Sequence, residues 1–331
     1  IIYSNLYRII RMTDLKITLL GTSGAIPTSQ RNLISNVIIR DNELFIFDTG
    51  ESIQQSMMKN KVGMNRPTHI FISHMHGDHI LGLLGLIQTM SLLLRDKPLF
   101  VYGPSGISRF LKSNISIFNI KLNLKLIIKE INSGLIVKTQ DYKIYAKKAN
   151  HSILNYSYVF IESDRPGKFY VSKAKKLGIP EGSLWSKLQS GHSIRYNGKS
   201  IRPTDVMGKS RPGRKIGISG DTRPSKSLTH FFSSCDILIH ESTFSNDQQD
   251  LAIERFHSTS TEAANVAKES SSTILILTHF SSRYNDVKLL EKQACKVHRN
   301  TIAGRDFMTF TVPYRDEKRL TKSYILEQTS Q

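Results

Sequence analysis

Cysteine is scarce in this chain of 331 residues, where Cys235 and Cys295 are the only two. Two cysteines cannot build a disulfide framework or a cysteine-rich zinc module, so we expect a reducing compartment. Long apolar runs are also missing. The longest, Ile80 to Leu94, is interrupted by polar residues and falls short of the roughly 20 residues that span a bilayer. We therefore expect a soluble protein. The first eleven residues lack the apolar core of a signal peptide, and both Ile1 and Met12 stay open as the natural start.

Acidic residues are few relative to basic ones, with 27 Asp and Glu against 46 Lys and Arg, which gives a formal net charge of +19. Such an excess favours a polyanionic partner. The alternative is a genome rich in A and T, whose codons load protein surfaces with Lys. At 39% hydrophobic and 22% charged residues, the composition excludes a disordered tail and a coiled coil. The length suits one large domain or two ordinary ones.

Short apolar segments predict strands in both halves of the chain. Helices are expected near Ser52 to Lys61, Gly82 to Leu94 and Ser260 to Lys268, the last with Ser258 to Ser260 as candidate caps. Residues 164–207 hold many Lys, Gly and Pro, and we expect them to leave the core. Strand and helix alternation favours an α/β class built of layers. The predicted strands are 15–20, 36–40, 43–48, 68–73, 98–102, 122–128, 142–146, 215–219, 237–240 and 273–278.

The segment that follows the strand at 68–73 carries the densest group of metal-ligating side chains. It reads His74-Met-His76-Gly-Asp78-His79, which gathers three imidazoles and a carboxylate within six residues. Strand ends present such side chains at the rim of a sheet, where substrates can reach them. Imidazole and carboxylate ligands without a nearby thiolate favour a hydrolytic metal such as zinc over an iron–sulfur cluster.

Three more residues lie just beyond predicted strands, where ligands would converge with this cluster. They are His151, Asp221 and His279. Each alone would be more typical of a surface residue, but their shared position favours a common site. We interpret His69, His192, His230 and His298 as structural or exposed, while His240 and His257 stay open.

Together these residues resemble the ligand set of the metallo-β-lactamase superfamily. Three further stretches are similar to the ribonuclease Z family, which processes tRNA 3′ ends: Asp164–Phe169 with Lys173–Pro180, Gly213–Pro224, and His240–Phe244. The resemblance spans roughly Leu15 to Val312. It implies a four-layer αβ/βα sandwich, a single domain over residues 1–331 with an inserted basic flexible arm over residues 164–207 that binds tRNA.

The same resemblance implies a role for each candidate residue. His74, His76 and His151 would hold one Zn²⁺, Asp78, His79 and His279 would hold a second in the same subunit, and Asp221 would bridge the two. Two metals of this kind can activate a shared hydroxide and stabilise the charge at phosphorus. Asp78 would accept a proton. His257, oriented by Glu241, would protonate the departing ribose oxygen; a supporting hydrogen-bond network is the alternative for these two.

Two departures from the family pattern qualify the expectation. The loop Pro27–Asn32 has Ser29 where the family often has Lys, which leaves the refusal of tRNAs that already end in CCA open. In the arm, Ser183 stands where the family usually has Pro. Trp185 either packs within the arm or contacts RNA, and packing is favoured.

The sequence therefore predicts a zinc-dependent endoribonuclease that cuts precursor tRNA 3′ of the discriminator nucleotide, leaving a 3′-hydroxyl on the tRNA and a 5′-phosphate on the trailer. A homodimer is expected from the resemblance, with precursor tRNA as the partner and no membrane. Another hydrolase of this fold (a thioesterase or lactonase) and a non-catalytic RNA-binding relic are the alternatives. The residue usage favours the stroma of a plastid (chloroplast), with a bacterial cytoplasm as the alternative.

Overall fold

A computed structural model describes residues 13–329, so the possible start at Met12 lies outside the described residues. The chain divides into two compact units. The larger consists of Asp14–Ile161 and the segment from Arg214 to the C-terminus, and the smaller is built around Glu162–Gly213. The smaller unit contains the predicted arm, 164–207, and extends a few residues beyond it on each side.

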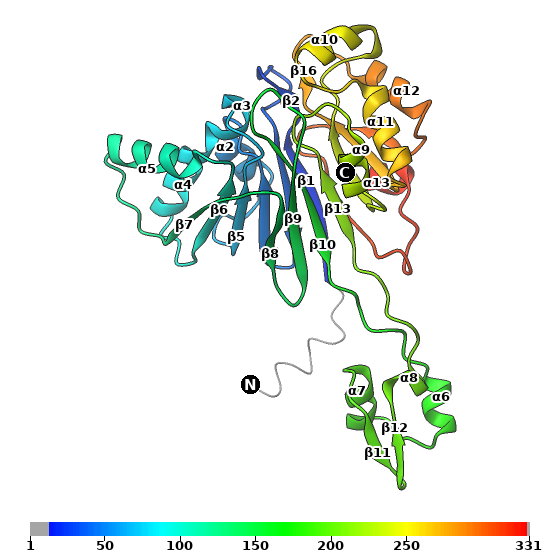
Figure 1. Ribbon diagram of the computed structural model, residues 1–331. Helices are drawn as coiled ribbons and strands as arrows, with labels where there is room; N and C mark the ends of the chain where they lie inside the picture. The colour runs from blue at the N-terminus through cyan, green and yellow to red at the C-terminus, as the bar shows by residue number, and fades with distance from the viewer. Residues whose placement is uncertain (1–12, 330–331) are drawn as a thin grey trace. The chain divides into compact units, whose positions relative to one another are not determined.

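The larger unit holds two seven-stranded sheets (Figure 1). In the first, β4, β5, β6 and β7 run parallel, whereas β18, β1, β3 and β4 pair antiparallel. Its order is β18-β1-β3-β4-β5-β6-β7. The strands are β1 (Leu15–Gly21), β3 (Ser35–Arg40), β4 (Glu43–Phe47), β5 (Thr68–Phe71), β6 (Leu99–Gly103), β7 (Leu126–Glu130) and β18 (Thr309–Thr311).

The second sheet has the same mixed character, with a parallel half at β13, β14, β15 and β17 and an antiparallel half that ends in the β8–β9 hairpin. Its order is β17-β15-β14-β13-β10-β9-β8. The strands are β8 (Gly134–Lys138), β9 (Tyr142–Lys148), β10 (Tyr156–Glu162), β13 (Lys215–Ile218), β14 (Ile237–Glu241), β15 (Ile274–Thr278) and β17 (Thr301–Ala303). A short parallel pair, β2 (Ser23–Gly24) with β16 (Phe280–Ser281), joins the two halves of the chain.

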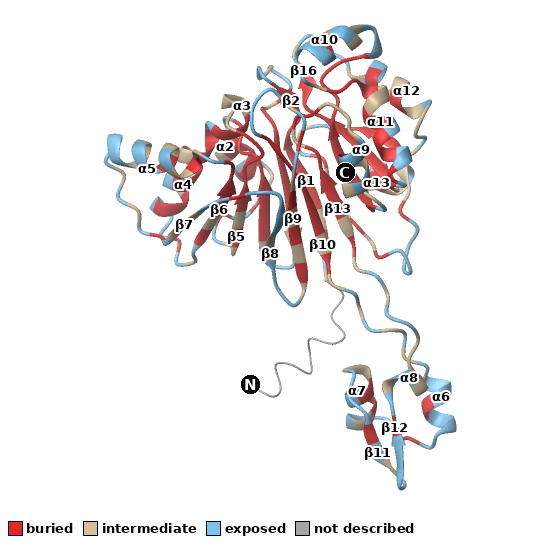
Figure 2. Ribbon diagram, viewed as in Figure 1, coloured by how far each residue is buried: buried red, intermediate tan, exposed pale blue. Residues whose placement is uncertain are grey.

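The two sheets face each other across the main core, which contains side chains from both, such as Ile17 and Phe45 from one and Tyr158 and Ile276 from the other. Figure 2 shows how the buried residues concentrate on the strands. The outer face of the first sheet packs on α2 (Ile53–Lys59), α4 (Gly82–Leu92) and α5 (Ile107–Ile117). The outer face of the second packs on α9 (Lys226–Phe231), α11 (Ser260–Glu269) and α12 (Lys288–Cys295). Helix, sheet, sheet and helix form the predicted four-layer α/β sandwich.

Three helices complete this unit: α3 (Gly77–Ile80) follows β5, α10 (Gln249–Glu254) precedes α11, and α13 (Lys322–Thr329) lies near the C-terminus. The predicted helix at 260–268 is capped by Thr259, whose hydroxyl accepts from the amide of Glu262 while the Glu262 carboxylate accepts from the amide of Thr259. This reciprocal capping box fixes the entry to α11 beside the site described below.

The smaller unit has its own core, in which Ala174, Trp185, Leu188 and Val206 are buried. Trp185 packs against Phe169 and donates its indole N–H to the carbonyl of Ile179, so the prediction that it packs within the arm is confirmed. The elements are α6 (Val171–Lys176), α7 (Ser183–Gln189), the hairpin of β11 (Ile194–Tyr196) and β12 (Lys199–Ile201), and α8 (Pro203–Val206).

Most predicted elements coincide with observed ones within a few residues. The strand predicted at 122–128 begins only at Leu126, because Leu122 and Leu124 pack beside the helical layer before the chain joins the sheet. No helix among residues 13–329 is long and apolar enough to cross a membrane.

Candidate active site

The carboxyl ends of strands from both sheets supply the candidate residues. His74, His76, Asp78 and His79 follow β5, His151 follows β9, Asp221 follows β13, and His279 follows β15 directly. Parallel strands deliver such residues to one edge of a sheet, which is why positions far apart in sequence converge. The structure brings all seven predicted ligands into one cluster.

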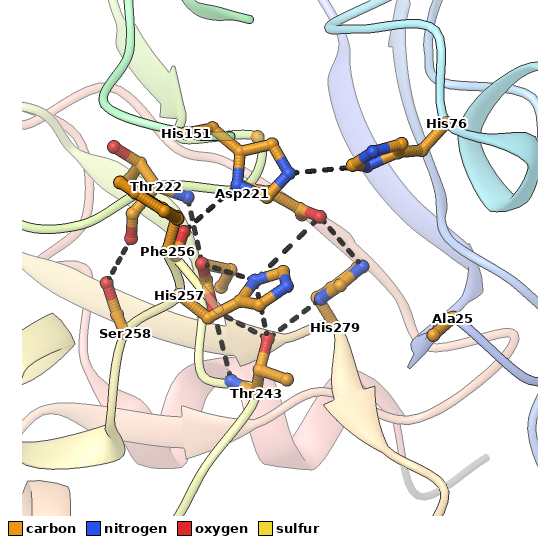
Figure 3. Close-up of polar contacts among 12 residues, drawn as sticks. Ala25, His76, His151, Asp221, Thr222, Thr243, Phe256, His257, Ser258 and His279 are labelled. Carbon is orange, nitrogen blue, oxygen red and sulfur yellow. Dashed lines mark hydrogen bonds and ion pairs between the residues drawn. The ribbon is translucent and has the colours of Figure 1, made fainter. Parts of the chain in front are cut away.

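In Figure 3, the ring of His151 points toward His76 and the carboxylate of Asp221 points toward His279. His74 Nε2 lies 2.9 Å from His76 Nδ1, and His151 Nε2 lies 3.3 Å from the same atom. On the other side, His279 Nε2 lies 3.3 Å from both His79 Nε2 and Asp78 Oδ2. Asp221 lies between the two groups, with Oδ2 3.7 Å from His74 Nε2 on one side and 3.3 Å from His279 Nε2 on the other.

Four of the histidines are fixed through the ring nitrogen that faces away from the cluster. His74 Nδ1 bonds to the hydroxyl of Ser73, His79 Nδ1 to the carboxylate of Asp48, and His279 Nδ1 to the hydroxyl of Thr243. His151 Nδ1 donates to the carbonyl of Phe256. Each of these rings therefore presents Nε2 to the centre, which is the orientation that metal-ligating histidines require.

The residues present fit a metal centre. Imidazole nitrogens face one another at 2.9–3.3 Å, and two carboxylates lie beside them. A cation can bind to the lone pairs of these nitrogens and oxygens. Asp221 Oδ1 is buried without a hydrogen-bond partner among residues 13–329, so it is also free to ligate. The structure groups His74, His76 and His151 on one side and Asp78, His79 and His279 on the other.

The pKa values of the cluster residues depend on burial and on charged neighbours. Burial lowers the pKa values of His74, His76 and His151, which favours the neutral imidazole that binds metal. Burial also lowers the pKa of His79, but Asp221 and Asp48 outweigh it and raise that pKa overall. Burial raises the pKa of Asp221, yet His279 and His79 bring it well below its usual range.

His257 and Glu241 lie together on one flank of the cluster. His257 Nδ1 is 3.0 Å from Glu241 Oε1, and Glu241 also accepts from the amide of Thr222 and the hydroxyl of Thr243. Glu241 is buried, whereas the His257 side chain is 16% exposed. His240, which the sequence left open, lies outside the cluster; its Nδ1 donates to the carbonyl of Glu241.

Access to the centre comes from one side. His74, His79, His279 and Asp221 are buried, while His76, Asp78, His151 and His257 are partly exposed. The partly exposed residues form the open face of the cluster, where a substrate would meet it.

Sequence reasoning missed Asp48, which follows β4 as the predicted ligands follow their strands. Its carboxylate accepts from the amide and hydroxyl of Ser73 at 2.7 and 2.8 Å and bonds to His79. It adopts a left-handed backbone with φ 61°, as do Ala25 (59°) and His279 (58°) at the same site. Such strain persists only where surrounding contacts hold it.

The loop after β2 contains Pro27, Arg31 and Asn32, and the sequence left its role in the refusal of CCA-ended tRNAs open. In the structure Arg31 turns inward, where its Nη2 donates to the carbonyls of Tyr284 and Ser281. The exposed residues of this loop are Ala25, Ile26, Pro27, Ser29 and Gln30. Gly24 lies so close to His279 that an added Cβ would be 2.4 Å from its ring, so only glycine fits there.

Comparisons with known proteins agree with this geometry. The family described as "Anti-Pycsar protein Apyc1" matches residues 15–161. Ribonuclease Z of Nitrosopumilus maritimus is 45% identical over 298 residues, covering 90% of this chain and 100% of that protein. Ribonuclease Z of Methanosarcina acetivorans is 44% identical and covers 92% of this chain and 100% of that protein.

Similar solved structures support the same family and fold. Human tRNase Z, short form, matches with a TM-score of 0.68 at 26% identity and covers 90% of this chain and 99% of its own. The metallo-β-lactamase fold protein YhfI of Bacillus subtilis has a TM-score of 0.65 at 19% identity, covers 90% of this chain and 100% of its own, and shows the fold alone. The sequence relatives named above are archaeal and give no support to the expected plastid origin, so the location stays a prediction. The chain belongs to the ribonuclease Z family, with the metallo-β-lactamase fold.

Proposed function

We propose that this protein is a zinc-dependent endoribonuclease that removes the 3′ trailer from precursor tRNA. It would cut 3′ of the discriminator nucleotide and leave a 3′-hydroxyl on the tRNA and a 5′-phosphate on the trailer. The observation that carries the proposal is the convergence of seven His and Asp side chains, in which four of the five histidines are already held through the outer ring nitrogen. The relatives named ribonuclease Z supply the substrate class.

His74, His76 and His151 would hold one Zn²⁺, Asp78, His79 and His279 a second, and Asp221 would bridge them. When bound, the metal would supply positive charge to the scissile phosphate and lower the pKa of the attacking water. Asp221 Oδ2 lies 3.7 Å from His74 of the first group and 3.3 Å from His79 of the second, which supports two cations with a shared carboxylate.

The residues on the open face would handle protons. Asp78 Oδ2 is held by the backbone amide of Ala25 at 2.7 Å, which aims the carboxylate at the centre and suits it to accept a proton from water. His257 is oriented by Glu241 and would donate a proton to the departing ribose oxygen. Thr243 bonds to Glu241, to His257 and to His279, so it links this pair to the ligands.

Precursor tRNA would also be held by the smaller unit. The smaller unit, Glu162–Gly213, carries eleven Lys and Arg against four Asp and Glu. Contacts from such a surface to phosphates position an RNA without reading its sequence, as an enzyme that accepts every tRNA requires. We also propose a homodimer, because apolar side chains at the ends of α4 and α5 are exposed, among them Leu94 at 75% and Ile117 at 74%.

The test is cleavage of a precursor tRNA with a 3′ trailer by zinc-reconstituted protein, with the product ends mapped and the zinc content measured. Unmutated protein should bind zinc and release a tRNA that ends in a 3′-hydroxyl at the discriminator. Asp78→Ala should lose cleavage. Failure of the unmutated protein to take up zinc and to cleave would refute the proposal.

A further inference from the structure

The β8–β9 hairpin at the edge of the second sheet carries a basic and aromatic face that the proposed catalysis does not use. The segment from Gly134 to Lys148 holds four Lys and a single acidic residue, Asp141. Along β9, the side chains of Tyr142, Ile144 and Ala146 enter the core between the sheets. Because side chains alternate along a strand, Lys143, Tyr145 and Lys147 point to the outer face.

The neighbouring strand extends this face. Leu135 lies opposite Tyr145, and Lys138 lies opposite Lys143. Leu135 is 47% exposed, and the helices α9, α11 and α12 pack over other strands of this sheet. Figure 2 shows exposed residues on β8. We call these five residues the hairpin face: Leu135, Lys138, Lys143, Tyr145 and Lys147.

Placing Lys138 directly across from Lys143 costs stability, because like charges on paired strands repel. None of the three lysines of the hairpin face forms a salt bridge within residues 13–329. An unpaired row of positive charge with an aromatic ring in its middle is the arrangement that binds single-stranded nucleic acid, in which lysines follow the phosphates and the ring stacks on a base.

The hairpin face is continuous with the active site. β9 ends at Lys148, and Asn150 and His151 follow within three residues. Asn150 is fixed by backbone pairing with Arg223 and by the Thr222 hydroxyl, so the face leads to His151 without a flexible joint. Lys143 and Lys147 lie about 13 Å apart along the strand at ~3.3 Å per residue, a spacing that follows an RNA strand over more than one phosphate.

We propose that the hairpin face binds the single-stranded 3′ trailer of the precursor and guides it away from the scissile phosphate. This inference rests on the proposed function, because the trailer is the part of that substrate that is unpaired and continuous with the cut. The bases of double-stranded RNA are paired and stacked, so Tyr145 cannot stack on them. The bases of an unpaired trailer are free to stack on this ring.

The experiment compares two precursors that differ only in the trailer, one with a single nucleotide and one with a long unpaired trailer. The variants are Tyr145→Ala and the triple Lys138→Ala/Lys143→Ala/Lys147→Ala. The matched control is a triple Lys59→Ala/Lys268→Ala/Lys292→Ala, which removes the same charge from exposed lysines elsewhere in the larger unit. Thermal unfolding of each variant reports whether it is folded.

For the long-trailer precursor, Tyr145→Ala should raise KM about fivefold or more, the lower end expected for the removal of one base stack. The triple variant should lower the slope of log KM against log salt by up to ~2, since each phosphate contact of a single strand contributes ~0.7. Both hairpin variants should cleave the single-nucleotide precursor as the unmutated protein does. The control triple variant should cleave both precursors as the unmutated protein does.

Equal effects on both precursors, or no effect on either, would overturn the inference while leaving the proposed function intact. Absence of cleavage by the unmutated protein would instead count against the proposed function. Anisotropy of both labelled precursors, bound to Asp78→Ala protein with and without the hairpin substitutions, tests the trailer contact without any cleavage. Equal affinity for the short-trailer and long-trailer precursors would contradict the trailer contact.

Discussion

Asp48 shows how a residue outside the ligand set can shape the centre. Its carboxylate holds Ser73 through two hydrogen bonds and His79 through a third, and Ser73 in turn bonds to His74. One buried side chain therefore orients a candidate ligand in each of the two groups. Hydrogen-bond partners of this kind raise metal affinity because the ligands need no reorganisation on binding.

Asp48→Asn should lower zinc affinity about 10- to 100-fold, because an amide cannot accept from all three donors. Competition with a chromogenic chelator measures the affinity directly. Asp250→Asn, on the exposed end of α10, is the matched control and should leave affinity unchanged. Equal affinity in the Asp48 variant and the unmutated protein would contradict the role assigned to Asp48.

The candidate ligands could be identified in the sequence because each lies just beyond an apolar strand. Asp48 has that position in the structure, but the sequence placed it at the end of the predicted strand 43–48, where it looks like an ordinary residue at a strand end. The inward turn of Arg31 could not be predicted either, since its partners at Ser281 and Tyr284 lie about 250 positions away. Pairings of that separation depend on the assembled sandwich and leave no local pattern.

At the scale of elements, the loop between β1 and β3 forms one wall of the centre, and Asp306 holds it. Asp306 accepts from the Thr22 hydroxyl at 2.8 Å and from the Asn32 amide at 2.6 Å. Between these two anchors, Ala25 donates to Asp78 and Gly24 packs against His279. The β17–β18 connection therefore positions a loop that contacts both a ligand and the predicted proton acceptor.

Asp306→Ala should destabilise the fold by about 1–3 kcal/mol, because it leaves the Asn32 amide and the Thr22 hydroxyl without their acceptor. Urea unfolding measures the change. Hydrogen exchange at the Asn32 amide should become faster, which separates release of this loop from a general loss of stability. An exchange rate as slow as in the unmutated protein would show that Asp306 does not hold the loop. Asp286→Ala, exposed and near Tyr284, serves as the control.

In the two large sheets, the strands missing from the prediction are the edge strands β8, β17 and β18 and the central strand β10. β14 and β15 are buried along their whole length, so continuous apolar runs predicted them. β8 was missed because it begins at Gly134, has exposed residues at both ends, and contains a register shift between Leu135 and Val137. Continuous apolar runs therefore identify β14 and β15, whereas an edge strand such as β8 depends on the partner that it pairs with.

At the scale of the whole molecule, the positive charge has more than one location. Residues 162–213 account for a net +7 of the total +19, so most of the excess lies elsewhere. The arm alone therefore does not account for the net positive charge. A precursor tRNA that is contacted both at its body and at its trailer gives separate basic surfaces a common partner, while lysines outside these surfaces remain consistent with genome bias.

The contribution of the smaller unit can be measured by its salt dependence. Lys173, Lys175 and Lys176 are exposed on α6. Substitution of all three by Ala should weaken precursor binding and lower the slope of log K against log salt by up to ~3, close to 0.9 for each phosphate that is no longer neutralised. Filter binding over a salt series gives the slope. A slope equal to that of the Lys59/Lys268/Lys292 control triple would contradict phosphate binding by α6.

The exposed apolar side chains on the outer helices lead to a prediction about assembly. Leu92, Leu93 and Leu94 at the end of α4 are 72%, 57% and 75% exposed, and Ile117 and Phe118 at the end of α5 are 74% and 63% exposed. The amide of Asn123, six residues after the end of α5, donates to Ser91 on α4, so the segment that follows α5 lies against the end of α4. Exposed large apolar side chains in such number are typical of an interface, and a twofold dimer uses the same patch from each copy.

Leu94→Glu/Phe118→Glu should convert a dimer into a monomer, because a stable interface would have to bury two carboxylates without partners. Light scattering coupled to size exclusion measures the mass in solution. Leu289→Glu, on α12 and 50% exposed, introduces the same kind of charge on the opposite helical layer and should leave the mass unchanged. A monomeric mass for the unmutated protein would refute the dimer. A dimeric mass for the double variant would place the interface on another surface.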